Sequence, residues 1–319
     1  MKKVSFIIRT LNEGDYLEKT LKSIYSQTYR NTEVIVVDSG STDKTIEIAL
    51  KYDCSVINIS KDDWSWGRSL NLGIENSSGD IICVTSGHCI LGSDDFLIKA
   101  LSKLEDSDVI FGKQNPLPNL DPYEEYELYK WYPSVYINNT DAIKAGKGVG
   151  VSNACNIFHK NVWENIKFDE NLQSMEDAEW ATRVAFSENI ILYCPDIYIY
   201  HSHPFDIKYI YRKWYCRQFE GYCFFNKYYG FYKRTKKNIL SGYAKKCLKF
   251  LMLPYYVYDF NKTNNYKLTY LKISGYFLIR DIADLQAYNH YMKNKTINYW
   301  GVDNRFLNKI VSKIKMGDF

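Results

Sequence analysis

Apolar and polar positions follow two alternating periods along the first 115 residues. Short, continuous apolar runs rich in Val and Ile are typical of strands buried on both faces. Such runs occupy residues 4–10, 33–40, 54–60, 80–86 and 108–114. The segments between them place apolar side chains at helical spacing, which predicts helices at residues 13–27, 41–53, 67–77 and 94–106. Strands that alternate with helices predict an α/β fold, in which a mostly parallel sheet is flanked by helices.

The pattern loosens after residue 115 and changes again near residue 205. The glycine-rich segment KAGKGVG at 144–150 lacks the flanking strand and the Gly-Lys-Ser/Thr ending of a phosphate-binding loop, so we expect an active-site loop there. Residues 206–319 read as helices rich in Lys, Arg and Tyr. The sequence therefore predicts two domains, an α/β domain at 1–205 and a helical C-terminal region at 206–319.

The composition is that of a globular protein with room for a large core. The 319 residues are 46% apolar and 24% charged, and a net charge of +4 argues against a dedicated nucleic-acid binder. The sequence contains no stretch of about 18 apolar residues that would predict a membrane-spanning helix. None of the eight cysteines forms a Cys-x-x-Cys pair, which favours reduced, buried thiols in a cytosolic protein over disulfides or a zinc site.

Candidate binding residues follow the predicted strands, because parallel sheets bind ligands beyond the carboxyl ends of their strands. These positions are 10–13, 38–43 and 85–88. In VIVVDSGSTDKT, the carboxylate of Asp38 follows a buried strand and could accept hydrogen bonds from a ribose or a base. The alternative is an ordinary turn, since Asp, Ser and Gly are common turn residues.

Four segments together closely resemble the family 2 glycosyltransferases of the GT-A fold. They are VSFIIRTLNEGDYLEKTLKSIYSQTY at 4–29, DSGSTDKT at 38–45, GRSLNLGIENSSGDIICVTS at 67–86 and EDAEWATRV at 176–184. The resemblance covers residues 4–205, and the C-terminal region matches only in outline. It implies a nucleotide-diphosphosugar transferase fold for the first domain and an inverting transfer of a sugar.

The resemblance also implies roles for individual positions. Asp38 would bind a uracil or thymine base or its ribose, and Arg68 would approach the diphosphate, where a guanidinium pairs with phosphate oxygens. For Arg68, an exposed salt bridge is the alternative. The full set implied for nucleotide-sugar binding is Thr10, Asn12, Glu13, Asp38, Ser39, Arg68, Asn71, Ser86, Gly87 and His88.

The chain departs from the family at the end of the fourth predicted strand. There the family places an Asp-x-Asp pair that holds a divalent cation, whereas this chain has Ser86, Gly87 and His88. Three explanations stay open. In the first, His88 binds a divalent cation such as Mn or Mg with a second histidine, either His201 or His203, the latter matching a histidine of many family members. In the second, the reaction is metal-independent and cationic side chains stabilise the diphosphate. In the third, the protein is inactive.

The segment SMEDAEWATRV contains the candidate acid–base residues. An inverting transferase needs a carboxylate that takes the proton of the attacking hydroxyl, and such a base is worth about 10²–10⁴-fold in rate. The resemblance implies Asp177 as this base and Glu176 as a residue that binds acceptor hydroxyls. Two further acceptor candidates are Trp180, one turn on, which could stack on the sugar, and Asn153, in the preceding loop, which could position either substrate. A helix N-terminus that simply attracts acidic residues is the alternative for the Glu-Asp pair, and packing is the alternative for Trp180.

The C-terminal region combines an aromatic helical face with basic residues over positions 206–252. Such a helix can lie on an anionic membrane surface. Equally, it can pack on the α/β domain or form an oligomer contact. The sequence leaves these three roles open.

Together these features predict an inverting glycosyltransferase that moves a sugar from a UDP- or dTDP-sugar to a hydroxyl of a bacterial surface-glycan intermediate of the capsule or O-antigen type. Its partners would be the nucleotide-sugar donor and a glycan or lipid-linked glycan acceptor. We expect the protein in the cytoplasm, or peripherally at the inner face of the cell membrane.

Two other functions compete with this prediction. A nucleotidyltransferase would need a glycine-rich, basic loop after the first strand, whereas RTLNEGDY is acidic there. A catalytically inactive nucleotide- or glycan-binding module would explain the missing Asp-x-Asp pair. It would not explain the presence of Glu176 and Asp177.

Overall fold

The computed structural model describes residues 1–117, 128, 131–145, 150–203, 207–229, 279–284 and 286–288. The chain divides into two compact units. The first comprises Met1–Leu120, Glu127–Leu172 and Glu176–His203, and the second comprises Asp121–Tyr126, Gln173–Met175 and Pro204–Phe319. All strands of the described chain belong to the first unit.

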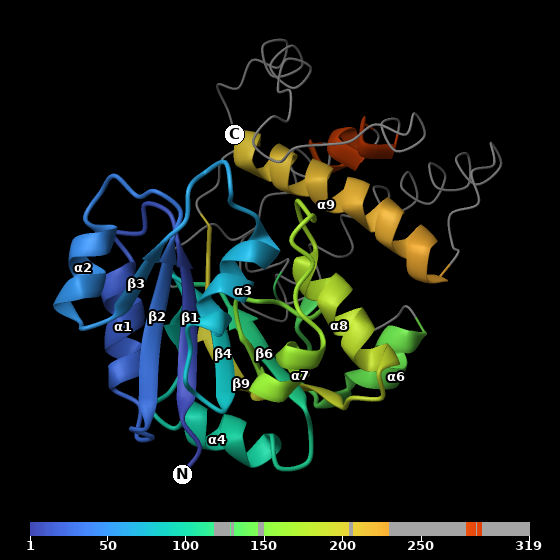
Figure 1. The fold of residues 1–319 in the computed structure, drawn as a ribbon. Helices are drawn as coiled ribbons and strands as arrows, with labels where there is room; N and C mark the ends of the chain where they lie inside the picture. Colours follow the sequence, from blue (N-terminus) through green and yellow to red (C-terminus); the bar gives the residue numbers. More distant parts are fainter. Residues whose placement is uncertain are drawn as a thin grey trace, which may run out of the picture. The chain divides into compact units, whose positions relative to one another are not determined.

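A mixed sheet forms the centre of the first unit (Figure 1). Its strands are β1 (Val4–Thr10), β2 (Thr32–Asp38), β3 (Ser55–Asn58), β4 (Ile81–Ser86), β5 (Ile90–Leu91), β6 (Val109–Asn115), β7 (Ile137–Asn138), β8 (Asn156–His159) and β9 (Ile191–Tyr200). They lie in the order β3-β2-β1-β4-β8-β6-β9-β5, and β7 pairs with β9. Strands β3, β2, β1 and β4 run parallel, as do β6 and β9, whereas β8 runs antiparallel between β4 and β6.

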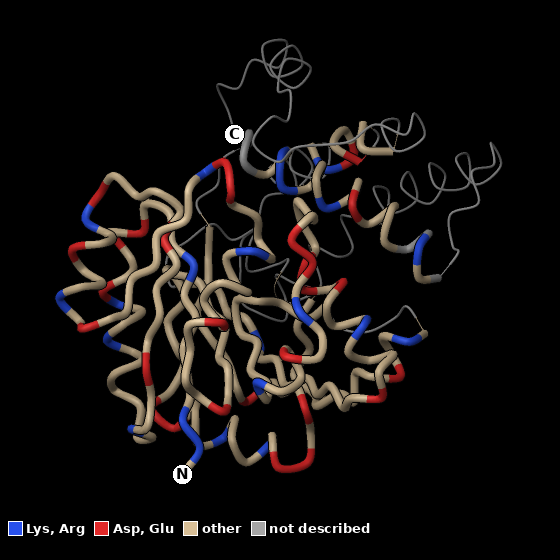
Figure 2. Tube along the Cα trace, viewed as in Figure 1, with Lys and Arg blue, Asp and Glu red and all other residues tan. Residues whose placement is uncertain are grey.

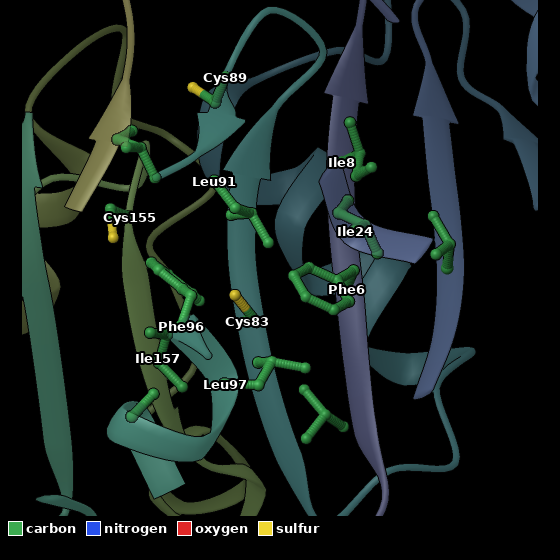
Figure 3. Packing of buried hydrophobic residues seen from close by; sticks show 14 of the residues in the cluster. Phe6, Ile8, Ile24, Cys83, Cys89, Leu91, Phe96, Leu97, Cys155 and Ile157 are labelled. Carbon is green, nitrogen blue, oxygen red and sulfur yellow. The ribbon is translucent and has the colours of Figure 1, made fainter. Parts of the chain in front are cut away.

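Helices cover both faces of this sheet. One apolar cluster joins a face of the sheet to α1 (Leu17–Tyr25), α2 (Thr45–Lys51) and α4 (Phe96–Lys103). A second cluster joins the other face to α3 (Trp66–Glu75), α6 (Asn139–Lys144), α7 (Lys160–Asn165) and α8 (Glu176–Phe186). Figure 3 shows the first cluster, in which Phe6, Cys83 and Ile157 of three strands pack with Ile24 and Leu97 of two helices. Each such side chain contributes about 1.5–3 kcal/mol on burial, so the two clusters fix where the strand ends lie.

The parallel register brings the carboxyl ends of β1, β2 and β4 to one edge of the sheet. Thr10 pairs with Asp38 across β1 and β2, and Arg9 pairs with Ser86 across β1 and β4. The backbone N–H of Gly87 then donates to the carbonyl of Arg9 at 3.2 Å. The loops that the sequence analysis singled out therefore leave the sheet side by side.

The predicted α/β fold is confirmed, with a largely parallel sheet and helices on both of its faces. Strand β8 was not predicted, because its apolar run is only four residues long and falls in the region where the pattern loosens. Positions 146–149, in the glycine-rich segment that we expected to form an active-site loop, lie outside the described residues.

The seven described cysteines are all free, and six of them are buried. Burial raises the pKa of Cys89 to about 11 and that of Cys194 to about 12. Such thiols stay protonated at neutral pH and are poor nucleophiles. This agrees with the prediction of buried, reduced cysteines.

Helix α9 (Ile207–Tyr229) is the longest described element of the second unit. The guanidinium of Arg280 lies 3.7 Å from the ring centroid of Trp214, and the hydroxyl of Tyr222 donates to a carboxylate oxygen of Asp284. Trp214 and Tyr222 belong to the aromatic helical face for which the sequence analysis considered membrane contact. At these two positions, the face contacts other residues of the protein. The basic segment at 233–253 lies outside the described residues. Among the described helices, none combines the length and the apolar content that crossing a bilayer requires.

Candidate active site

Asp38 ends strand β2, is fully buried and organises the loop that follows it. Its Oδ1 accepts hydrogen bonds from the backbone N–H groups of Gly40 (2.9 Å) and Ser41 (2.8 Å). Its Oδ2 accepts from the hydroxyls of Thr10 (2.9 Å) and Ser41 (2.5 Å). Gly40 has a φ of 94°, a left-handed conformation that favours glycine. This is the turn that the sequence analysis held as the alternative, and the contact of Asp38 with a base or ribose stays a prediction.

The loops after β1 and β2 hold each other in place. Asn12 has a φ of 56°, its side-chain oxygen accepts from the N–H of Thr42 at 2.9 Å, and its own N–H donates to the hydroxyl of Ser41 at 2.7 Å. Ser39 donates to the carbonyl of Thr10 through both its N–H and its hydroxyl, at 3.1 Å each. Hydrogen bonds therefore connect the two loops into one wall, that is, one continuous surface at the carboxyl edge of the sheet, which contains Thr10, Asn12 and Ser39.

Glu13 supports a histidine from the neighbouring strand. His88 follows β4, and its Nδ1 lies 2.8 Å from Oε1 of Glu13. The approach depends on Gly87, because a Cβ there would lie 2.9 Å from Cγ of Glu13 and 3.0 Å from Cγ2 of Thr10. The carboxylate of Glu13 therefore orients His88, and the nucleotide contact that the resemblance implied for Glu13 stays a prediction. Ser86 ends β4, and its carbonyl accepts from the N–H of Cys89 at 3.1 Å.

Three histidines that are far apart in sequence meet at this edge. The Nε2 atoms of His88 and His201 are 3.0 Å apart, and the ring of His203 lies 4.9 Å and 4.6 Å from the other two rings, centroid to centroid. One ligand atom of each histidine falls within 4.8 Å of the others. The sequence analysis named all three histidines, and the structure brings them together.

The hydrogen-bond partners of Nδ1 in two of these rings favour one tautomer of each ring. Gln114 donates its amide N–H to the hydroxyl of Tyr132 at 2.6 Å, so its Oε1 accepts from Nδ1 of His201 at 2.7 Å. The carboxylate of Glu13 likewise accepts from Nδ1 of His88. Both Nε2 atoms therefore present lone pairs to each other, unless one ring gains a second proton. A cation between them would remove this conflict, because each Nε2 could then direct its lone pair at the metal. The residues thus fit a metal ion, and three imidazoles suit Mn, Fe or Zn better than Mg.

Helix α8 carries the predicted acid–base residues to the same edge. Glu176 is 6% exposed, and its Oε1 accepts from Nη1 of Arg9 (3.1 Å) and from the side-chain amide of Asn153 (3.3 Å). Asp177 follows in the first turn of α8 and is partly exposed. The ion pair between Arg9 and Glu176 joins α8 to β1. Thr10, the residue after Arg9, donates a hydrogen bond to Asp38. Sequence reasoning missed Arg9, although a lone arginine inside the apolar run VSFIIRT was a visible signal.

Trp180 corrects one expectation at the acceptor. Its ring is fully buried, stacks on Phe168 at 4.9 Å between centroids, and donates its N–H to the carbonyl of Ile166 at 2.6 Å. A side chain with no exposed surface cannot stack on a sugar, so packing is the correct interpretation. The burial of Trp180 one turn after Glu176 instead fixes where α8 begins.

Two residues of helix α3 also differ from what the resemblance implied. Asn71 is buried; its amide donates to the carbonyl of Phe168 and to Glu170, and its oxygen accepts from Trp163 and from the N–H of Phe168. These contacts use its hydrogen-bonding capacity, so Asn71 holds α3 against the loop before α8 and is left out of the proposed site. Arg68 is half-exposed and forms a 3.7 Å ion pair with Glu170, as in the salt-bridge alternative.

Comparison with known proteins shows the family of the chain. Residues 5–166 match the profile described as glycosyl transferase family 2. The O-antigen chain rhamnosyltransferase RfbN of Salmonella typhimurium is 28% identical over 212 residues, which cover 64% of this chain and 67% of that protein. An uncharacterized glycosyltransferase of Rickettsia typhi is 37% identical over 109 residues, so the match spans only 34% of the length of each protein.

Solved structures show the same fold at low sequence identity. The mannosyltransferase PcManGT of Pyrobaculum calidifontis, in complex with GDP-Man and Mn2+, matches with a TM-score of 0.57 and 18% identity over 89% of this chain and 87% of that chain. Residues 1–349 of S. aureus TarS, in complex with UDP-GlcNAc, match with a TM-score of 0.50 and 17% identity over 93% of each chain. These two glycosyltransferases have the GT-A fold that the sequence predicted.

Proposed function

The chain belongs to glycosyl transferase family 2 and is a glycosyltransferase, and from this premise we propose that it is an inverting enzyme that uses a UDP- or dTDP-sugar. The acceptor we propose is a hydroxyl of a bacterial surface-glycan intermediate of the capsule or O-antigen type. The relatives named as O-antigen chain rhamnosyltransferases support this acceptor class. The carrying observation is the ion pair between Arg9 and Glu176, which joins the start of α8 to the loops at the carboxyl edge of the sheet.

In the proposed mechanism, Asp177 takes the proton of the attacking hydroxyl while that oxygen displaces the nucleoside diphosphate at the anomeric carbon. Inversion follows from a single displacement from the opposite face. The buried Trp180 holds the first turn of α8 in place, so the base is positioned before the substrates arrive. Glu176 lies beside it and would bind sugar hydroxyls, and Asn153, which donates to Glu176 at 3.3 Å, would help to position the substrate.

The nucleotide would lie against the wall formed by Thr10, Asn12 and Ser39, with the base or ribose next to Asp38. Arg68 is exposed enough to turn from Glu170 toward the diphosphate. The backbone at Ser86 and Gly87 completes the floor of this site.

For the cation, we propose that Ser86, Gly87 and His88 replace the Asp-x-Asp pair of the family. His88, His201 and His203 would hold a divalent metal ion, oriented by Glu13 and Gln114. When bound, that ion supplies positive charge for the leaving diphosphate. The complex of PcManGT with Mn2+ supports a cation of this class.

We further propose that residues 1–205 are the catalytic domain and that residues 206–319 serve the acceptor, the membrane surface or an oligomer contact. A glycan carried on a lipid would bring the enzyme to the inner face of the cell membrane. Otherwise we expect it in the cytoplasm.

The test is the substitution Asp177→Asn in the full-length protein, which removes the base and keeps its shape. Turnover of the donor should fall about 10²–10⁴-fold, because the proton of the acceptor hydroxyl is no longer accepted. Calorimetric affinity for UDP or dTDP should stay unchanged. Asp141→Asn is the matched control, since Asp141 lies in the first turn of α6 and is exposed. Wild-type turnover in Asp177→Asn would overturn the proposal, whereas an inactive wild-type protein that binds nucleotide would favour a binding module.

A further inference from the structure

A chain of buried polar side chains runs from the middle of the sheet to its carboxyl edge. The amide of Asn156 on β8 donates to Oδ1 of Asn153 at 3.0 Å, and the amide of Asn153 donates to Oε1 of Glu176 at 3.3 Å. Arg9 on β1 donates to the same oxygen at 3.1 Å. Asn156 is 0% exposed, Asn153 2% and Glu176 6%. Two donors that are distant in sequence, Arg9 and Asn153, therefore meet on one carboxylate oxygen of Glu176, and Asn156 supports Asn153 from behind.

The ion pair within this chain is built asymmetrically. Arg9 uses only Nη1, which donates to Glu176 and, at 3.4 Å, to the carbonyl of Trp66, while its guanidinium lies 4.7 Å from the ring centroid of Trp66. Among the described residues, Nη2 of Arg9 and Oε2 of Glu176 make no hydrogen bond, and neither is sealed inside the protein. Nε of Arg9 and Oδ1 of Asn156 are buried and have no hydrogen-bond partner. A donor and an acceptor thus remain available on the two charged groups.

A second ion pair on α8, between Arg183 and Glu179, uses both carboxylate oxygens and so provides a comparison. Arg183 donates to the carboxylate of Glu179 through two nitrogens. Nε lies 2.9 Å from Oε1 and 3.0 Å from Oε2, and Nη2 lies 2.7 Å from Oε2. Glu179 is 4% exposed. Arginine and carboxylate usually pair in this two-pronged way, because their geometries match. One turn earlier, Glu176 meets its arginine through one oxygen only.

We propose that Arg9 and Glu176 form a subsite for two neighbouring hydroxyls of a sugar, an inference that rests on the proposed function. Nη2 of Arg9 donates to one hydroxyl oxygen, and Oε2 of Glu176 accepts the proton of the other hydroxyl. Because each hydroxyl both donates and accepts, a sugar diol matches this pair of charged groups. Asn153 and Trp66 hold the two charged groups in position behind it.

The electrostatics favour a neutral sugar over the diphosphate at this point. Arg9 is already neutralised by Glu176, and the open oxygen of Glu176 would repel a phosphate group. The three histidines form a separate cluster, supported by Glu13 and Gln114. Since Glu176 directly precedes the proposed base Asp177, hydroxyls bound here lie near the reacting centre.

The sugar can come from either substrate, and the experiment separates the two sources. Glu176→Gln keeps an oxygen for Arg9 and Asn153 but replaces the open acceptor by a donor. Its affinity would be measured by calorimetry for UDP, dTDP, UDP-glucose, UDP-N-acetylglucosamine and dTDP-rhamnose, and for the methyl glycosides of glucose, galactose, mannose and rhamnose. A loss of tenfold or more for a nucleotide sugar, with unchanged affinity for the nucleotide alone, supports a donor subsite. The same loss for a methyl glycoside supports an acceptor subsite.

Arg9→Met should show the same selective loss, and Glu179→Gln is the matched control. Glu179→Gln opens the two-pronged pair, so it should lower thermal stability without changing any affinity of the folded protein. An equal loss for UDP and for UDP-sugars in Glu176→Gln would overturn the proposal, because the site would then bind the anion. Unchanged affinities for all sugars would also overturn it. If wild type binds no nucleotide sugar, the proposed donor fails, and the methyl glycosides still decide the subsite.

Discussion

The two ends of strand β4 both gather polar side chains, but they satisfy them differently. At the amino end, the carboxylate of Glu33 accepts from Lys3 (2.7 Å), from the hydroxyl of Ser5 (2.5 Å) and from the N–H and hydroxyl of Ser78 (2.7 Å and 2.9 Å). At the carboxyl end, Nε of Arg9 is sealed without a partner, and the imidazoles of His88 and His201 bring their Nε2 atoms to 3.0 Å. One end is a closed network, and the other is open.

This difference separates stability from function within one sheet. A buried polar group without a partner costs about 1–3 kcal/mol, so the carboxyl end is less stable than a closed network would be. Such violations of good packing concentrate at functional sites, where a ligand completes them. Acidic and basic residues are interspersed along the first unit (Figure 2), so the charge distribution alone does not mark the functional end. The functional end is marked instead by the polar groups that lack a hydrogen-bond partner or face another acceptor.

Among the substitutions that compare the two ends of β4, those of the histidines should have the largest effect. His203→Ala should lower the affinity for Mn²⁺ by at least about 10–100-fold, because it removes a ligand outright and losing even an outer-shell partner costs that much. The loss should be visible in calorimetry and in the electron paramagnetic resonance of bound Mn²⁺. Donor turnover should fall with it and should be abolished in wild type by a chelator.

His159→Ala is the matched control, because His159 lies at the amino end of β4. It pairs with Ile81 in the sheet, and its Nε2 lies 3.0 Å from the carbonyl of Leu104. We expect a stability loss of about 1 kcal/mol and unchanged metal affinity. Equal metal affinity in His203→Ala and His159→Ala, with turnover that ignores the chelator, would favour the metal-independent explanation.

Two glycines at opposite ends of β4 should sharpen the comparison. In Gly79→Ala, the new Cβ would lie 2.4 Å from Oγ of Ser5 and 2.8 Å from the carbonyl oxygen of Lys3, which predicts a loss of about 1–3 kcal/mol in unfolding free energy. In Gly87→Ala, it would press on Glu13 and Thr10, so Glu13 should shift from His88 and Mn²⁺ affinity should fall about tenfold. Urea unfolding and Mn²⁺ titration of both variants give the result. If both substitutions acted on stability alone, the two ends would not differ.

The smallest effect concerns Glu33 and depends on pH. Burial acts to raise the pKa of Glu33, but hydrogen bonds from Lys3, Ser5 and Ser78 outweigh it and lower the pKa to about 2. Because this pKa is lower in the folded state, its contribution is complete above about pH 5 and is lost as pH falls toward about 2. Glu33→Gln should cost on the order of 2 kcal/mol at pH 7, discounted for partial exposure, and the difference should vanish toward pH 2. Urea unfolding across this range measures it, and kcat at pH 7 should not change.

The sequence predicted the fold well where local patterns determine it. Apart from the two-residue strand β5, the strands and helices of residues 1–115 follow from continuous apolar runs and helical spacing, since each element buries its own apolar face. Strand β8 was not predicted, because four residues are too few to show a strand pattern. Its position between β4 and β6 depends on pairing with strands that are distant in the sequence.

The candidate site was predicted only in part. The resemblance identified His88, His203 and Asp177, because motif positions carry them. The pairing of Arg9 with Glu176 could not be read from the sequence, since the two residues are 167 positions apart and meet only after the sheet and α8 have packed. Trp180 could not be decided either, because packing and sugar stacking require the same aromatic residue.

The burial of the cysteines makes the protein suitable for selective chemical labelling. Six of the seven described thiols are shielded, and only Cys223 is partly exposed. With Cys223 and Cys247 changed to serine, Lys61→Cys would offer maleimide one accessible target, and the side chain of Lys61 lies near Gly40 in the loop after β2. A dye attached there would report the arrival of a nucleotide as a fluorescence change, in real time and without any turnover.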